Sequence, residues 1–295
     1  MVLFAACKED HNLVSLTNSL PPADTNYTAA TETAEARNVL IEEFTGANCP
    51  NCPTGHQDIE ALKAQYGNTL HSIAYHFIYP GYLQSYPAQG GQYDFRTQIG
   101  TSIESSVYSG VSAIPAAGVD RFQYAGNLLL SDGVWGTAVA ARIASASSTN
   151  SPINLYISST YNPSSDTAAT ITATMKYVTT VAAGQNLSIA IVEDSLLDVQ
   201  DSESVLTPNY VFNNIFRDMV TSSNPTAGDA LLTTYSSATI PAGLVNVRRY
   251  TYKLTQGAPQ QNNSILSPQH CRVIAFVTDN TTHEVLQSAE CPLVH

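Results

Sequence analysis

Basic side chains are scarce in this chain. It has 12 lysine and arginine residues against 24 aspartate and glutamate residues, which gives a formal net charge of −12 at pH 7. Nucleic acids and anionic membrane surfaces attract proteins through clustered positive charge, so we expect no nucleic-acid partner. Scarce lysine, with abundant Ser, Thr, Asn and Tyr, is a composition common among exported bacterial proteins.

Long apolar runs and cofactor motifs are also missing. No stretch approaches the roughly 20 apolar residues that a membrane-spanning helix needs. The sequence shows no phosphate-binding loop, serine triad or calcium loop, and we expect no cofactor. The hydrophobic fraction of 43% is still sufficient for packed cores, and a length of 295 residues favours two domains.

Cysteine is rare, with five residues, but two of them give the best functional signal in the chain. Residues 39–45 have the composition of a buried strand, and a short turn leads to Cys49 and Cys52. A helical pattern follows over residues 52–66, and residues 70–77 indicate a second buried strand. The start of a helix stabilises a thiolate, and a second cysteine one turn later can close a disulfide.

These residues resemble the active-site strand and loop of the thioredoxin superfamily. In that family a buried acid lies six positions before the first cysteine, and here that position is Glu43. A second hallmark is a cis-proline that faces the cysteines, and Ile114-Pro115 matches it. The common tryptophan before the first cysteine is replaced by Asn48. The resemblance covers residues 37–150 and implies an α/β thioredoxin-like domain.

The gap between Cys52 and Pro115 is longer than in a minimal thioredoxin. We therefore expect an insertion at residues 79–108, beside the cysteines, with a helix over residues 92–108. Residues 119–122 are expected to continue the sheet, and residues 132–144 to form a closing helix.

After residue 151 the pattern changes to an alternation of apolar and polar residues. Several short segments of this kind, without helix-rich intervals, indicate an all-β immunoglobulin-like antiparallel sandwich over residues 151–295. The segment 195–242 is the least regular part, and within it residues 211–218 have the pattern of a short helix.

The N-terminus resembles the end of a lipoprotein signal. Residues 1–7 end in two alanines and Cys7, as a lipobox does, and charged residues follow. The apolar run is shorter than the 7–15 residues of a complete signal, so we interpret the signal as truncated. Cys7 would then carry the lipid that anchors the chain in a membrane, and residues 8–36 would form a flexible tether. The alternative is an ordinary chain terminus with a chance cysteine.

The whole chain resembles the exported lipoproteins called twenty-eight-kilodalton outer-membrane-protein-related, which pair a thioredoxin-like half with a β-sandwich half. Residues 272–287 resemble the closing hairpin of that family. The resemblance implies an outer membrane lipoprotein on the periplasmic or cell-surface face. It does not supply an activity.

The first functional hypothesis is a membrane-tethered thiol–disulfide oxidoreductase whose partners are the thiols and disulfides of exported proteins. Cys49 would attack a substrate disulfide as a thiolate, and Cys52 would resolve the mixed disulfide. Glu43 would accept the proton of Cys52, because Glu42 points to the opposite face of the strand. Pro115, with Ile114 before it, would shape the substrate groove.

Three alternatives stay open. The cysteine pair is a structural disulfide in the first, and in the second it binds zinc with His56, which completes a Cys-x2-Cys-x3-His spacing. If no metal binds, His56 helps to lower the pKa of Cys49. In the third alternative the chain is a non-catalytic lipoprotein that binds a surface partner, with the thioredoxin-like half as a scaffold. Solvent access to the Cys49 sulfur distinguishes the oxidoreductase from the non-catalytic lipoprotein. An open sulfur favours the enzyme, and a sulfur covered by the insertion favours the scaffold.

A second disulfide is predicted between Cys271 and Cys291. The segments 271–278 and 284–291 flank a turn-rich sequence, and a hairpin centred on Thr281 places the two cysteines opposite each other. Opposed residues of antiparallel strands lie within the Cα separation that a disulfide accepts. An exported protein meets oxidising conditions, so the two are expected to pair.

Overall fold

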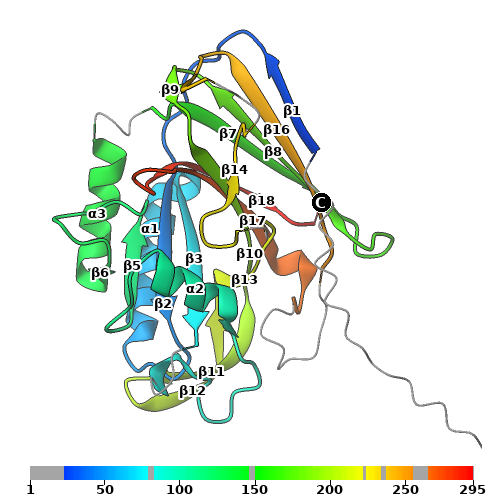
Figure 1. Ribbon diagram of the computed structural model, residues 1–295. Coiled ribbons are helices and arrows are strands. Elements are labelled where there is room, and N and C mark those ends of the chain that lie inside the picture. The colour runs from blue at the N-terminus through cyan, green and yellow to red at the C-terminus, as the bar shows by residue number, and fades with distance from the viewer. Residues whose placement is uncertain are drawn as a thin grey trace, which may run out of the picture.

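The computed structural model describes residues 23–78, 83–145, 150–221, 224–233, 237–254 and 265–294. Within these residues the fold is β-rich and has few helices (Figure 1). The α-helices are α1 (Cys52–Tyr66), α2 (Gln98–Ser106) and α3 (Asp132–Ala144). The 3-10 helices are η1 (Gly67–Thr69), η2 (Leu83–Ser85) and η3 (Pro268–His270). None of the helices in these ranges has the length and apolar character needed to cross a membrane.

The larger sheet joins strands from distant parts of the chain. Its strands are β2 (Val39–Thr45), β3 (Leu70–Phe77), β4 (Arg96–Thr97), β5 (Ala116–Val119), β6 (Leu130–Ser131), β10 (Gln185–Glu193), β13 (Ile215–Met219), β14 (Asp229–Ala230), β17 (Cys271–Asp279) and β18 (Val285–Pro292). The order is β18-β17-β10-β13-β3-β2-β5-β6, with β4 on β3 and β14 on β10. Because β2 and β3 lie inside this order, both are buried along their whole length.

Helices cover both faces of the sheet around β2. On one face α1 and α3 bury Ile59, Trp135 and Val139 against Ile41 and neighbouring strand residues. On the other face α2 packs its side chains, with Ile103 at the centre, against aromatic residues of β2 and β3. These two cores fix the end of β2, and therefore the loop that leads into α1.

A smaller four-stranded sheet, with the order β1-β16-β8-β7, packs against the part of the larger sheet that β10 and β17 form (Figure 1). Its strands are β1 (Ala23–Thr28), β7 (Ile153–Thr160), β8 (Ala169–Tyr177) and β16 (Leu244–Tyr252). Side chains such as Ile171 and Met175 on β8 form one core with Ile189 and Val273. Two small two-stranded sheets complete the fold. Strand β9 (Val181–Ala182) pairs with the distant β15 (Thr239–Ile240), and β11 (Leu196–Ser202) forms a hairpin with β12 (Val205–Phe212).

Helix α3 ends at Ala144, and β7 begins at Ile153. The residues before and after this connection share the larger sheet, because β13 pairs with β3 on one side and with β10 on the other. Strand β10 buries alternate residues in two different cores, which explains why it is covered on both faces. The sandwich expected after residue 151 therefore uses a sheet that continues into the first part.

The structure corrects four local expectations. Residues 23–28 of the expected tether form β1, which pairs along β16. The insertion helix begins at Gln98, and the residues expected as a helix at 211–218 lie in β12 and β13. Residues 215–218 form a strand in spite of their helical pattern, because β13 pairs with a strand on each side, β10 and β3. Strand β5 ends at Val119, since Asp120 and Arg121 have φ values of 51° and 50°.

The predicted Cys271–Cys291 disulfide is wrong. Both cysteines are free, and the register pairs Cys291 with Val273. A shift between Val277 and Thr278 displaces the strands near the turn, so Cys271 and Cys291 become diagonal neighbours. Diagonal Cα atoms on paired strands are about 7–8 Å apart, beyond the reach of a disulfide. The other expectation at a terminus, the lipid on Cys7 with the signal at residues 1–7, lies outside the described residues.

Candidate functional site: a buried disulfide and a buried carboxyl at the start of α1

Cys49 and Cys52 are joined by a disulfide, with their Cα atoms 5.4 Å apart. Cys52 is the first residue of α1, and Pro53 follows in its first turn. Proline is tolerated there because the first N–H groups of a helix have no partner within the helix. The loop before it is closed by a hydrogen bond from the Cys49 backbone N–H to the Gly46 carbonyl. The helix expected over residues 52–66 and a disulfide between Cys49 and Cys52 are therefore both present.

The Ile114–Pro115 peptide bond is cis and lies beside the disulfide. The Cys49 Sγ atom is 3.7 Å from the Ile114 carbonyl oxygen. Helix α1 approaches the same segment so closely that a Cβ atom at Gly55 would lie 2.9 Å from the Pro115 Cβ. A glycine is needed at position 55 for this contact.

Two segments cover the cysteine loop. From the β11–β12 hairpin, the N–H groups of Asp201 and Glu203 donate to the carbonyls of Ala47 and Pro50 at 2.8 and 2.9 Å. On another side the Asn48 N–H donates to the Tyr86 carbonyl at 3.1 Å. Both cysteines are 0% exposed. The Cys49 sulfur is thus closed off from solvent in this structure. The insertion covers the cysteine loop, which is the arrangement expected for a scaffold, and so does a hairpin that the sequence did not indicate.

The Gln200 side chain fastens the hairpin to this loop. Its Nε2 group donates to the carbonyls of Cys49 and Asp201 at 3.0 and 2.7 Å, and it lies 3.3 Å from the Gly46 carbonyl. Gln200 is fully buried. A single amide therefore ties the turn before the disulfide to the strand that covers it.

Glu43 lies beneath the first turn of α1. It is only 2% exposed, and its Oε1 atom would be 3.2 Å from a Cβ atom at Gly55. That oxygen accepts no hydrogen bond. Burial raises the pKa of Glu43 to about 8, the negative charge of Glu60 adds to the rise, and a hydrogen bond with Thr45 opposes it.

The neighbouring Glu42 has the opposite environment. Its carboxylate accepts hydrogen bonds from both arms of the Arg121 guanidinium at 2.7 and 2.9 Å, and from the hydroxyls of Tyr75 and Tyr108. The two acids thus point to opposite faces of β2, as strand geometry requires. Only Glu43 lies on the face of the sheet that α1 covers.

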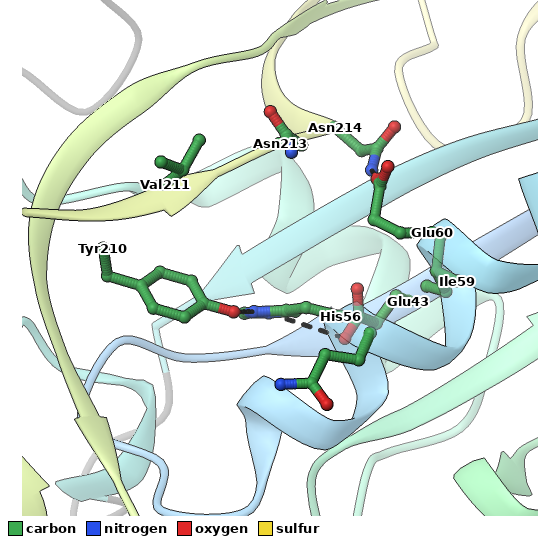
Figure 2. A pocket seen from close by; sticks show the side chains of 9 residues that line it. Glu43, His56, Ile59, Glu60, Tyr210, Val211, Asn213 and Asn214 are labelled. Atoms are coloured by element: carbon green, nitrogen blue, oxygen red, sulfur yellow. Dashed lines mark hydrogen bonds and ion pairs between the residues drawn. The ribbon is translucent and has the colours of Figure 1, made fainter. Parts of the chain in front are cut away.

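His56 links α1 to the hairpin. Its Nδ1 atom is 2.8 Å from the Tyr210 hydroxyl, and its Nε2 atom is 2.8 Å from the Thr45 hydroxyl and 3.7 Å from the Glu43 Oε1. Burial lowers the pKa of His56 to about 4, so the ring is neutral at pH 7. Figure 2 shows the Tyr210 hydroxyl directed at His56, with Glu43 on its other side.

These side chains line a pocket of about 230 Å³ between α1 and the end of β12. Its walls include Glu43, His56, Glu60, Tyr210 and Asn214. Both ring nitrogens of His56 are occupied by hydrogen bonds, and the two sulfurs are bonded to each other. In the described part of the chain no group of three or more His, Cys, Asp or Glu side chains is arranged to hold a metal ion.

Sequence reasoning found six of the residues that meet here and missed three. The six are Glu43, Cys49, Cys52, His56, Ile114 and Pro115. The three that it missed are Thr45, Gln200 and Tyr210. Thr45 carried a usable signal, because it lies two residues after Glu43 on the same face of a strand. Gln200 and Tyr210 are more than 140 residues away and carried none.

Two solved structures are similar to this chain. A structure of HBP35 of Porphyromonas gingivalis matches with a TM-score of 0.64 and 16% sequence identity, over 89% of this chain and 77% of that one. A domain of the outer membrane lipoprotein Omp28 from Porphyromonas gingivalis matches with a TM-score of 0.32 and 16% identity, over 49% of this chain and 89% of that one. No curated protein sequence matches significantly.

The family comparison is more specific than the structural ones. The family described as outer membrane protein Omp28 matches residues 104–291, which is more than half of the chain. The matched residues begin after the cysteine loop, so the match bears on the family and not on the chemistry of the disulfide. The chain belongs to the Omp28 family of outer membrane proteins, as the resemblance in its sequence implied.

Proposed function

We propose that this lipoprotein is a thiol–disulfide oxidoreductase of exported proteins, with Cys49 and Cys52 as its redox pair. The order of strand, turn, Cys-x-x-Cys and helix supports a thioredoxin-like reading of residues 37–150. The position of the Ile114 carbonyl, 3.7 Å from the Cys49 sulfur, supports it further. In such a site the backbone next to the proline pairs with a peptide that is held as a mixed disulfide.

The observation that carries the proposal is the Glu43 carboxyl. A structural disulfide has no use for a buried acid with an unpaired oxygen, and burying such a group costs stability. A strongly perturbed acid that lines a pocket is instead typical of a proton-transfer site. With a pKa of about 8, Glu43 is matched to a cysteine thiol, whose ordinary pKa is about 8.5.

The chemistry balances with this set of residues. In the reduced protein the Cys49 thiolate attacks a substrate disulfide, forms a mixed disulfide and releases one substrate thiolate. The Cys52 thiol then gives its proton to the Glu43 carboxylate and attacks the Cys49 sulfur. The Cys49–Cys52 disulfide forms, the second substrate thiolate leaves, and the substrate has gained two electrons.

The covered sulfur makes the β11–β12 hairpin part of this function. A substrate reaches Cys49 only if the hairpin moves away from the cysteine loop, where Asp201, Glu203 and Gln200 hold it. We propose that the hairpin acts as a lid that a protein substrate displaces.

A trapping experiment tests the proposal. Cys52→Ser is expected to accumulate mixed disulfides with exported proteins through Cys49, and Cys49→Ser is expected to accumulate none. The proteins are purified from the cell envelope after acid quenching and compared on non-reducing gels. Equal trapping by the two variants, or trapping by neither, contradicts the assignment of Cys49 as the nucleophile.

A second candidate is the non-catalytic partner-binding lipoprotein, and the burial of both cysteines favours it. In that case the disulfide stabilises the loop against which the hairpin packs, and the outer side of the hairpin, with Leu197 and Val211 exposed, contacts a surface partner. The reduction potential separates the two functions. A value below about −300 mV indicates a structural bond, and one between about −270 and −120 mV a catalytic pair.

Anchoring follows the same family assignment. We propose that Cys7 carries the lipid and that the folded part lies on the periplasmic or cell-surface face of the outer membrane. The mass of the N-terminal peptide tests the lipid, and protease treatment of intact cells distinguishes the two faces.

A further inference from the structure

We infer that the pocket between α1 and the end of β12 binds a primary ammonium group, with the carboxyls of Glu43 and Glu60 as its partners. The ligand class is an alkylammonium, which a lysine side chain of a protein carries and which small free amines also supply. The inference goes beyond the cysteine chemistry, because it concerns binding alone and holds for either of the two candidate functions.

The lining of the pocket has a buried part and an exposed part. Glu43 and Ile59 are buried, whereas Gln57, Glu60 and Val211 are exposed. Glu43 therefore lies at the inner end of the pocket, and Glu60 lies at its mouth (Figure 2). The volume of about 230 Å³ is below the roughly 300–1,000 Å³ of pockets that hold drug-sized ligands, so the space suits one side chain or a small amine.

The Glu43 carboxyl lacks a hydrogen-bond donor on one oxygen. The residue is 2% exposed, and its Oε1 atom accepts no hydrogen bond from the described residues. A buried acceptor without a donor costs free energy, and a donor supplied by a ligand removes that cost. An ammonium group suits this oxygen because it has three N–H donors, no acceptor, and a charge opposite to that of a carboxylate.

The side chains next to Glu43 do not supply that donor. His56 Nε2 is 3.7 Å from the Glu43 Oε1 and only 2.8 Å from the Thr45 hydroxyl. The other ring nitrogen of His56 is 2.8 Å from the Tyr210 hydroxyl. Burial lowers the pKa of His56 to about 4, so the ring carries no positive charge that could pair with Glu43 at neutral pH.

Two basic side chains near the mouth of the pocket have other partners. Lys63 Nζ and Arg272 Nη2 both donate to the Asn214 Oδ1 at 2.8 Å. The Asn214 Nδ2 group in turn donates to one oxygen of Glu60 at 3.2 Å. Among the described residues that line the pocket there is no lysine or arginine. The pocket thus presents two carboxyls and no basic side chain, which favours a cation over an anion.

The apolar part of the lining suits the alkyl chain that carries the ammonium group. It consists of Ile59, Val211 and the ring of Tyr210. Long cationic side chains lay their methylene groups along apolar surface while the charged head stays with polar partners. A bare metal ion fits less well, because the described residues contain no group of three or more His, Cys, Asp or Glu side chains arranged to hold one.

Binding is expected to be coupled to the ionisation of Glu43. Burial raises the pKa of this carboxyl to about 8 and the charge of Glu60 adds to the rise, so most of it is protonated at pH 7. A bound ammonium favours the carboxylate, which lowers the pKa and releases a proton.

The other titratable side chains on this side of the sheet stay neutral between pH 6 and 9. Burial lowers the pKa of His56 to about 4 and that of His76 to about 3, and it raises the pKa of Tyr210 to about 12. The affinity should therefore rise from pH 6 to 8 as Glu43 ionises, and level off between pH 8 and 9. A lysine side chain keeps its proton over this range, since its ordinary pKa is about 10.4.

Isothermal titration calorimetry of the oxidised full chain tests the site, with the blocked tripeptide acetyl-Gly-Lys-Gly-amide as the probe. The matched control is the same peptide with its lysine side chain acetylated, which removes the charge. We expect the acetylated peptide to bind at least about tenfold more weakly. Titrations in two buffers of different ionisation enthalpy count the protons released, and about one proton per bound lysine peptide is expected at pH 7.

Three variants locate the bound group. Glu43→Gln should weaken binding about tenfold at pH 8.5 and abolish the proton release. The exposed Glu60→Gln should weaken it about twofold to fivefold, and Glu203→Gln, an exposed acid outside the pocket, should stay within about twofold of the wild type. Equal affinities for the two peptides, or unchanged proton release in Glu43→Gln, would overturn the inference.

The n-butylammonium ion separates the two sources of the ammonium group. If it binds as tightly as the lysine peptide or more tightly, the site takes small free amines. Weaker binding than that of the peptide assigns the site to a lysine side chain of a protein. No binding of either probe to the wild type overturns the inference, and the trapping experiment with Cys52→Ser is independent of all these outcomes.

Discussion

The two cysteine pairs of this protein each lie beside a buried glutamate, and the surroundings of the two acids differ. Glu193 stands opposite Cys271 in the sheet register, forms an ion pair with Arg217 at 3.2 Å and accepts a hydrogen bond from the Leu266 N–H at 2.9 Å. Glu43, near the Cys49–Cys52 disulfide, has an oxygen without any donor. Removing one partner of a buried ion pair leaves the other charge uncompensated, whereas strongly perturbed buried acids cluster at functional sites.

The cysteines follow the same division. Cys49 and Cys52 are three residues apart, and a single turn brings their sulfurs together. Cys271 and Cys291 lie on paired strands and stay apart because the register is displaced. Burial raises the pKa of Cys291 to about 12 and that of Cys271 still further, so neither is poised as a thiolate at neutral pH.

The largest expected effect comes from the compensated acid. Glu193→Gln removes the carboxylate that pairs with the buried Arg217 at 3.2 Å and is expected to lower the free energy of unfolding by about 3–5 kcal/mol. Denaturant unfolding at pH 7 measures it, with the exposed Glu203→Gln as the matched control. A loss below about 1 kcal/mol would show that the two buried acids are equivalent.

The uncompensated acid is expected to respond in the opposite sense. Because the folded-state pKa of Glu43 is raised from 4.5 to about 8, its contribution to stability is complete below pH 4.5 and is lost as the pH rises toward 8. Glu43→Gln removes this loss, so the variant should gain up to about 4 kcal/mol relative to the wild type between pH 4.5 and 9. A constant difference between the two proteins across this pH range would contradict a raised pKa.

Moving one cysteine by two residues should create the bond that the wild type lacks. Val273→Cys places a thiol directly opposite Cys291, and the resulting disulfide is expected to stabilise the oxidised variant over its reduced form by about 3 kcal/mol. Non-reducing peptide mapping identifies the bond. Recovery of a Cys271–Cys291 linkage in either protein would show that the register is not as described.

The smallest expected change in stability concerns the cover of the disulfide. Gln200→Ala removes the amide that bridges the cysteine loop and the hairpin, at a cost of about 1–2 kcal/mol. It should also make reduction of Cys49–Cys52 by dithiothreitol about tenfold faster, because the hairpin opens more often. The exposed Gln269→Ala serves as the control, and equal reduction rates would argue against a hairpin that limits access.

Local sequence was sufficient for the elements whose pattern and boundaries lie within one short segment. The bounds of α1, β3 and α3 agree with the expectation, because an apolar stripe at helical spacing or a continuous apolar run identifies each of them. The helix expected at residues 211–218 failed for the complementary reason. Part of this segment forms β13, because β3 and β10 each supply a strand with which it pairs. A short window of the sequence does not reveal these distant partners.

By itself, the sequence determined the family, the disulfide of Cys49 and Cys52, and the burial of Glu43 on the face of β2 that α1 covers. These depend on spacings of two to six residues, over which backbone geometry alone fixes what meets. Only the tertiary structure decided that a hairpin covers the disulfide, that Tyr210 reaches His56, and that Cys271 and Cys291 miss each other. Those outcomes depend on strand register and on contacts between segments far apart in the chain. A displacement of two residues in the register is enough to separate Cys271 from Cys291.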